Sequence, residues 1–206
     1  AGAAAGGVFA DRFGRRRTIT LASVPFLLGY LIISTSYIYP ALLVGRFLTG
    51  IGCGLVSFVT PVYLSEISPP RLRGMLGASN QLGITVGILL VYLLGIDSLG
   101  LGWRHLAFLG VFPSAVLLVA TFTILPETPR WLLSKQHVEY AGIALRKIRG
   151  TDDVAAEVAS IQSALAATAD QPTATLKDLL APELKRQMVI GIGMMVLQQF
   201  SGVNAV

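Results

Sequence analysis

The sequence predicts an all-α polytopic membrane protein, on the basis of its composition and the spacing of its charges. Apolar residues make up 53% of the 206-residue chain, charged residues only 13%, and the mean hydropathy is +0.69. Soluble domains usually carry about 25% charged residues, so this chain lacks the polar surface needed to face water on all sides. The charges that remain fall in three blocks, which are separated by long apolar runs.

Four apolar runs are long enough to cross a membrane as helices. They cover residues 18–36, 41–65, 74–96 and 106–126, and Arg46 is the one charge within them. Each has about 20 residues or more, which is the length that a helix needs to cross a hydrocarbon core of about 30 Å. A short apolar stretch covers residues 1–10, and another run continues from Met188 to Val206. Because residue 1 is not Met and the last run is cut, we expect a piece of a longer chain.

Lysine and arginine are concentrated on one side of the predicted bundle. The connections on that side, residues 11–17, 66–73 and 127–186, hold 4, 2 and 8 of the 16 basic residues. Loops rich in Lys and Arg stay in the cytoplasm, and short loops give the stronger signal. We therefore expect residues 11–17, 65–73 and 126–186 to be cytoplasmic. The protein is expected in the plasma membrane, with an intracellular membrane as the alternative.

Glycine recurs in two of the predicted spans, where small residues allow helices to approach closely in lipid. The two sets are Gly45, Gly50, Gly52 and Gly54, and Gly74, Gly77, Gly83 and Gly87. Three glycines spaced by two could also suggest a nucleotide-binding loop. A dinucleotide-binding loop needs three residues, not two, from its second glycine to its third, and it follows a strand. We therefore predict that these glycines mediate helix contacts instead.

The polar segment between the fourth and fifth long runs is predicted to form short amphipathic helices. Val138, Ala141, Leu145 and Ile148 repeat at helical spacing, and Gly150 is a plausible C-terminal stop. Thr151 or Asp152 is expected to cap a second helix. Helices this short are marginal alone in water, so their apolar stripes must pack on one another or on the ends of the spans.

Five short motifs lie at the ends of the predicted spans or within them. They are Gly7-x-x-x-Asp11-Arg12-x-Gly14-Arg15-Arg16; Pro61-x-Tyr63-x-x-Glu66-x-Ser68-Pro69 followed by Arg73-Gly74; Gln81-Leu82 with Gly87; Pro126-Glu127-Thr128-Pro129-Arg130-Trp131-Leu132; and Gln198-Gln199-x-Ser201-Gly202-x-Asn204. In this order the set resembles the sugar porter branch of the major facilitator superfamily, which includes the GLUT-type facilitative transporters. The first motif marks the superfamily, and the last two together are specific to sugar porters.

The resemblance covers essentially the whole chain and implies a partial major facilitator superfamily bundle with a cytoplasmic helical insert between its two halves. Residues 1–125 would run from the end of the second transmembrane helix through the sixth. Residues 126–186 would form the insert, and residues 187–206 would begin the seventh of twelve helices.

The resemblance also implies a sugar site on two of these spans. Gln and Asn side chains donate and accept hydrogen bonds without charge, which suits a neutral ligand rich in hydroxyls. Gln81 is an amide in an apolar span, and Ile84 and Ile88 lie on the same helical face. The positions that match the family's sugar contacts add Gln198, Gln199, Val203 and Asn204, with Ile84 and Val203 as an apolar wall.

A sugar site shared by these amides requires a bend in the last span. An ideal helix separates Asn204 from Gln199 by about 140°, so a shared site needs a bend, which we expect at Ser201-Gly202. The alternative role for an intramembrane amide is an interhelical hydrogen bond that only holds the bundle together.

Charged residues at the cytoplasmic span ends are predicted to form a gating network. Alternating access requires contacts between the two halves that form in one state and break in the other. The candidates are Asp11, Arg12, Arg15, Arg16, Glu66, Arg73, Glu127 and Arg130. The alternative is that these charges only set topology, which explains Arg17 well but does not explain the three acids.

Facilitated diffusion is preferred over proton-coupled symport. Coupling requires an intramembrane acid that changes protonation, and no complete predicted span holds Asp or Glu in its interior. The resemblance places the coupling acid of the symporters in the first helix, ahead of residue 1. A proton-coupled sugar or polyol symporter and a non-transporting sugar sensor stay open as alternatives.

Other function classes have little support. His105 and His137 are the only histidines, and no nucleophile, base or metal-ligand spacing converges on them. A channel would need a charged or carbonyl-lined constriction, whereas the polar groups within these spans are amides. We expect a sugar substrate and the lipid bilayer as partners, and no enzyme activity, metal, cofactor or nucleic acid.

Overall fold

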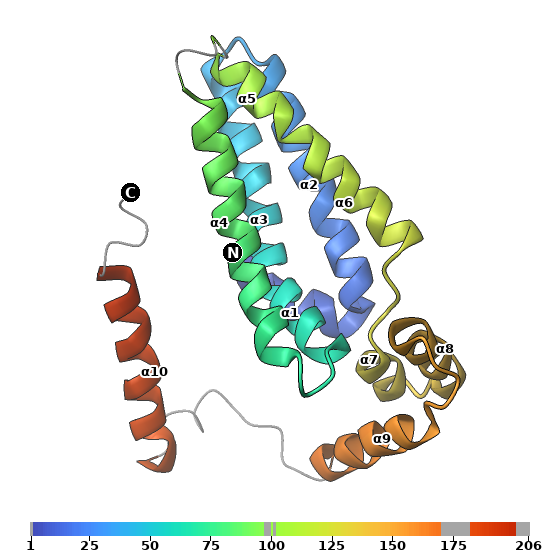
Figure 1. Ribbon diagram of the computed structural model, residues 1–206. Coiled ribbons are helices and arrows are strands. Elements are labelled where there is room, and N and C mark those ends of the chain that lie inside the picture. The colour runs from blue at the N-terminus through green and yellow to red at the C-terminus, as the bar shows by residue number, and fades with distance from the viewer. Residues whose placement is uncertain (1, 97–99, 101, 170–181, 201–206) are drawn as a thin grey trace. The chain divides into compact units, whose positions relative to one another are not determined.

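A computed structural model describes residues 2–96, 100, 102–169 and 182–200 (Figure 1). Every regular element in these ranges is a helix, which agrees with the predicted all-α class. The chain divides into two compact units, Ala1–Gln162 and Ser163–Val206. The predicted domain boundaries after residues 125 and 186 stay a prediction.

Four helical segments of the first unit are long and apolar enough to span a membrane, as the sequence predicts. They are α2 (Arg15–Thr35), α3 (Tyr39–Ile67), α4 (Arg73–Leu94), and α5 (Trp103–Leu109) with α6 (Val111–Thr123), which together cover Trp103–Thr123. Their mean hydropathies lie between 1.5 and 2.1. The shorter α1 (Gly2–Phe13) precedes them. In the second unit, α10 (Pro182–Phe200) contains the apolar stretch Arg186–Leu197.

Helices α2 and α3 lie side by side and approach closely at glycines (Figure 1). A Cβ added to Gly45 would lie 2.6 Å from Ile33 Cγ1 and 3.0 Å from the Gly29 carbonyl oxygen. A Cβ added to Gly52 would lie 2.9 Å from Phe26 Cδ2. The prediction that glycines mediate helix contacts is therefore confirmed for Gly45 and Gly52, whereas a Cβ added to Gly50 would meet no atom of another described helix within 4 Å.

The core of the first unit lies where α1, α2 and α3 meet. Val59 and Tyr63 of α3 are buried together with Ala10 and Ile19, and Leu117 of α6 packs against this cluster. Helix α4 differs, because it packs mainly against α3 and buries none of its residues within the described chain. A Cβ added to Gly74, Gly77, Gly83 or Gly87 of α4 would meet no atom of another described helix within 4 Å, so their predicted helix contacts stay a prediction.

The described part of the insert up to residue 169 contains three short helices, α7 (Pro129–Ser134), α8 (Val138–Arg149) and α9 (Ala155–Ala169). The predicted end of α8 is confirmed, since Gly150 has a φ of 68° and its N–H donates to the Arg146 carbonyl. The predicted cap of the next helix is wrong. Helix α9 begins at Ala155, because the buried Val154 occupies the cap position and its carbonyl accepts the first helical N–H, from Val158.

Candidate functional site

The turn between α1 and α2 depends on Gly14. Its φ of 94° lies in the region that favours glycine. A Cβ at this position would also collide with Glu127 Oε2. Glycine therefore meets two requirements here, because it allows the backbone to turn and lets a carboxylate approach the start of α2.

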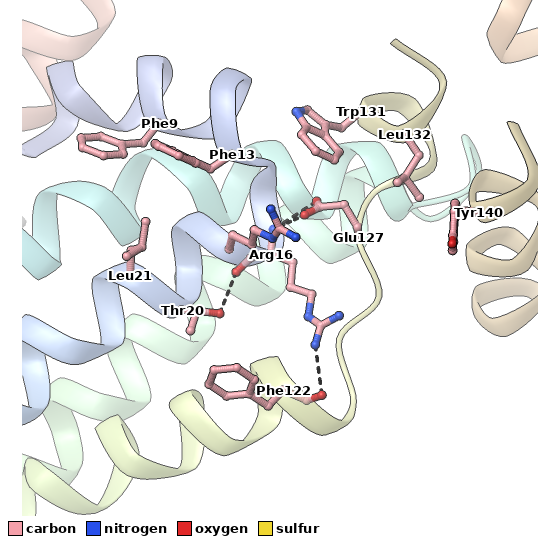
Figure 2. Close-up of a pocket in the computed structure, with 11 residues that line it drawn as sticks. Phe9, Phe13, Arg16, Thr20, Leu21, Phe122, Glu127, Trp131, Leu132 and Tyr140 are labelled. Atoms are coloured by element: carbon pink, nitrogen blue, oxygen red, sulfur yellow. Dashed lines mark hydrogen bonds between the residues drawn. The ribbon is translucent and has the colours of Figure 1, made fainter. Parts of the chain in front are cut away.

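Glu127 uses that approach to cap the N-terminus of α2. Its Oε1 accepts hydrogen bonds from the backbone N–H groups of Arg15 (2.9 Å), Arg16 (3.1 Å) and Thr128 (3.0 Å). The first N–H groups of a helix have no partner within the helix, and its N-terminus carries partial positive charge. Figure 2 shows the Glu127 carboxylate pointing toward the Arg16 backbone. The connection between α6 and α7 is thereby fastened to α2.

Arg15 joins the same turn to the end of α3. Its Nη2 lies 2.9 Å and its Nε 3.2 Å from Glu66 Oε1, and only 13% and 7% of the two side chains are exposed. Arg15 Nη1 also pairs with Asp11 Oδ1 at 3.3 Å, although Asp11 is largely exposed. The other carboxylate oxygen of Glu66, Oε2, is buried and has no hydrogen-bond partner within the described part of the chain.

The C-terminal end of α6 is held by two further side chains. Arg16 donates from Nε to the Thr121 carbonyl at 2.6 Å and from Nη2 to the Phe122 carbonyl at 3.1 Å (Figure 2). The Tyr63 hydroxyl of α3 donates to the Pro126 carbonyl at 2.9 Å. The last carbonyls of a helix need partners from outside it, and Arg16 of α2 provides two here, while Tyr63 holds the segment that follows α6.

Two further residues, in α7 and α8, attach the insert to the bundle. Arg149 donates from Nη1 to the Ile67 carbonyl at 2.9 Å, and its other nitrogens bind both carboxylate oxygens of Glu157 at 2.7 and 3.1 Å. Trp131 Nε1 donates to the Asp11 carbonyl at 3.0 Å. The end of α8 is thus tied to the end of α3, and α7 to the end of α1.

The eight predicted gating residues fall into two groups. Asp11, Arg15, Arg16, Glu66 and Glu127 lie together in the contacts described above. Arg12, Arg73 and Arg130 are exposed and form no ion pair with any described residue, although the Arg12 guanidinium lies 5.6 Å from the Phe13 ring centre.

Sequence reasoning assigned no role to Tyr63, Arg149 or Trp131, which also hold these ends together. Tyr63 and Trp131 belong to quoted motifs, and Tyr63 lies three residues before Glu66, on the same side of α3. That spacing is a signal that could have identified it. The three residues bind backbone carbonyls, which are present at every position and leave no mark in the sequence.

The predicted sugar-binding residues are only partly described. Gln81, Ile84 and Ile88 lie on α4 with exposed side chains. Gln198 and Gln199 belong to α10, but their side chains lie outside the description, as do Val203, Asn204 and the expected bend at Ser201-Gly202. The described residues therefore do not test whether these side chains form one site.

Comparison with known proteins matches the chain to the family described as "Sugar (and other) transporter" over residues 1–206. Sugar transporter ERD6-like 8 of Arabidopsis thaliana is 43% identical over 207 residues. The mouse (Mus musculus) protein "Solute carrier family 2, facilitated glucose transporter member 8" is 40% identical over 215 residues. These alignments cover 100% of the chain but 43% and 42% of the relatives, so the chain spans less than half their length.

Two solved structures of the xylose transporter XylE are similar over 100% of the chain, each with 30% sequence identity. One is the E. coli protein in a partially occluded inward-open conformation, with a TM-score of 0.77 over 50% of that chain. The other is described as a major facilitator superfamily proton:xylose symporter bound to 6-bromo-6-deoxy-D-glucose, with a TM-score of 0.78 over 48% of that chain.

Proposed function

The chain belongs to the family of sugar (and other) transporters in the major facilitator superfamily, and we propose that the full-length protein carries a hexose or related sugar across a membrane by alternating access. The match over all 206 residues is the observation that carries this proposal. Similarity to a glucose transporter and to a sugar-bound xylose symporter supports the substrate class. The relatives are transporters, which favours transport over catalysis.

The sugar site is proposed to include Gln81, Ile84 and Ile88 of α4, with Gln198, Gln199, Val203 and Asn204 from the second half. The exposure of Gln81 supports this role. An amide that served only as an interhelical link would need a partner, and the Gln81 side chain has none among the described residues. Within the described part of the chain, its donor and acceptor are therefore both available to a sugar hydroxyl.

The gate is proposed to use the exposed members of the charged set rather than all eight residues. Contacts of Arg15, Arg16, Glu66 and Glu127 lie within the first unit of the chain, so they would persist when the halves rock as bodies. Asp11, Arg12, Arg73 and Arg130 keep their charges exposed. The unpaired Oε2 of Glu66 is a further acceptor for a donor from the other half.

Facilitated diffusion is the proposed mode of transport, with proton symport as the second candidate. Within the described spans α2 to α6, no Asp or Glu lies in the interior, since Glu66 is next to the last residue of α3. The relatives divide on this point, because one is named a facilitated glucose transporter and another a proton:xylose symporter. We propose that the connections at residues 11–17, 65–73 and 126–186 lie in the cytoplasm. The protein is proposed to reside in the plasma membrane.

The test uses the full-length protein in sealed vesicles. Uptake of radiolabelled glucose, fructose and trehalose is followed with and without a proton uncoupler. We expect saturable uptake that stops at the external concentration and ignores the uncoupler. Accumulation that the uncoupler abolishes would establish the symporter instead. Binding without uptake of any of the three sugars would point to a sensor and contradict the transport proposal.

A further inference from the structure

A hollow of about 910 Å³ lies beside the charged turn, between α1, the start of α2, the end of α6 and the insert (Figure 2). Its volume falls within the range of roughly 300–1,000 Å³ typical of ligand pockets. Phe13, Leu21 and Phe122 line it, and their side chains are 37%, 47% and 64% exposed. No contact described for the transport cycle uses this apolar surface.

The charge available to a ligand in this hollow is positive. Glu127 is the one carboxylate in the lining, and its oxygens accept hydrogen bonds from three backbone N–H groups. Arg16 is held by two carbonyls of α6. Arg17 is exposed and forms no ion pair or hydrogen bond with any described residue, so its guanidinium is free to bind an anion.

The arrangement of polar and apolar groups indicates an amphiphile rather than a free anion. Leu21 lies one helical turn beyond Arg17, about 6 Å further along a helix that is apolar enough to span a membrane. Trp131 and Tyr140, residue types that are enriched at membrane–water interfaces, line the hollow near the insert. A headgroup at Arg17 would therefore lie at the interface, with its chain against Leu21 and Phe122 in the hydrocarbon.

We propose that this hollow binds an anionic phospholipid of the cytoplasmic leaflet, with its phosphate on Arg17 and an acyl chain along Phe13, Leu21 and Phe122. Basic pockets at this depth attract anionic headgroups, and each basic residue near the surface contributes about 1 kcal/mol. Gln81, Ile84 and Ile88 of the proposed sugar site do not line this hollow, and lipid binding here does not require sugar transport.

The test is a titration of the purified full-length protein with dioleoylphosphatidylglycerol or dioleoylphosphatidylcholine, followed by native mass spectrometry. We expect preference for phosphatidylglycerol and a loss of about fivefold in its affinity in Arg17→Gln, which is the ratio for one basic contact. Arg17→Lys should retain most of the affinity, which separates loss of charge from misfolding. Arg71→Gln is the matched control, since Arg71 is exposed at the same end but does not line the hollow.

Three results would overturn the proposal. Arg17→Gln could bind phosphatidylglycerol as tightly as the unaltered protein does. Arg71→Gln could weaken binding as much as Arg17→Gln does, which would indicate an effect of diffuse surface charge. Displacement of the lipid by millimolar inorganic phosphate would indicate a site for a free anion. Because lipid binding is measured without sugar, these outcomes stay distinct from a failure of the transport proposal.

Discussion

Glu127 accepts hydrogen bonds from three backbone N–H groups of two segments, so its removal should loosen this whole end of the first unit. We predict that Glu127→Ala destabilises the full-length protein by about 2 kcal/mol, since hydrogen bonds to a charged group contribute about 1.5–3 kcal/mol. The measurement is the apparent Tm in detergent. The Tm of Glu127→Gln should lie between those of Glu127→Ala and the unaltered protein, because the amide keeps one acceptor oxygen.

Glu139→Ala is the control for that experiment, because Glu139 is an exposed acid of α8. It should leave the Tm unchanged. If Glu127→Ala behaved like Glu139→Ala in stability but shifted the balance between inward-open and outward-open states, Glu127 would belong to the gate instead of to the fixed contacts of one half.

At the scale of helices, the contact between α2 and α3 depends on backbone approach at glycine. Gly45→Ala would place a methyl group 2.6 Å from Ile33 Cγ1 and 3.0 Å from the Gly29 carbonyl oxygen, where the backbone cannot yield easily. Overpacking of this kind costs about 1–3 kcal/mol, so we predict a lower Tm and lower yield of folded protein. Gly50→Ala, in the same helix, meets no atom within 4 Å among the described residues and should be neutral or slightly stabilising. Equal loss in both variants would contradict the role of Gly45 in helix contact.

The attachment of the insert gives a second prediction at this scale. Arg149→Gln removes the ion pair with Glu157 and the hydrogen bond to the Ile67 carbonyl. We predict faster amide hydrogen exchange in α8 and at the start of α9, because the end of α8 loses its link to α3. Arg146→Gln is the matched control, as Arg146 lies one turn earlier and is exposed. Unchanged exchange in Arg149→Gln would show that apolar contacts of Leu145 and Val154 hold the insert without it.

Features that depend on local sequence were predictable at this scale. The four spans follow from run length and composition, and the end of α8 follows from Gly150 because a single glycine can terminate a helix. The start of α9 was misplaced because Thr151 and Asp152 are good caps in isolation, whereas burial of Val154 fixes the helix start. Tertiary contact overrode local preference there.

For the whole molecule, the sequence predicted which charged residues gather at one end of the bundle. It could not predict the partner of each. Asp11, Glu66 and Glu127 share the same chemistry and the same end of the bundle, yet their partners are set by distances between helices. Glu127 binds backbone N–H groups, Glu66 binds Arg15, and Asp11 is mostly exposed. The predicted sugar site depends likewise on residues of two halves that are far apart in sequence, so its geometry stays a prediction.

The proposed transport role depends on Gln81 of α4 binding the transported sugar. Its most direct test is the initial rate of radiolabelled glucose uptake by the full-length protein in sealed vesicles, compared between Gln81→Ala and Asn80→Ala. Asn80 is the adjacent amide, half-buried and about 100° away around the helix. Loss of a sugar hydrogen bond should cost about 1 kcal/mol or more, so we predict at least a fivefold fall in kcat/KM for Gln81→Ala and little change for Asn80→Ala. Equal rates in Gln81→Ala and the unaltered protein would contradict the claim.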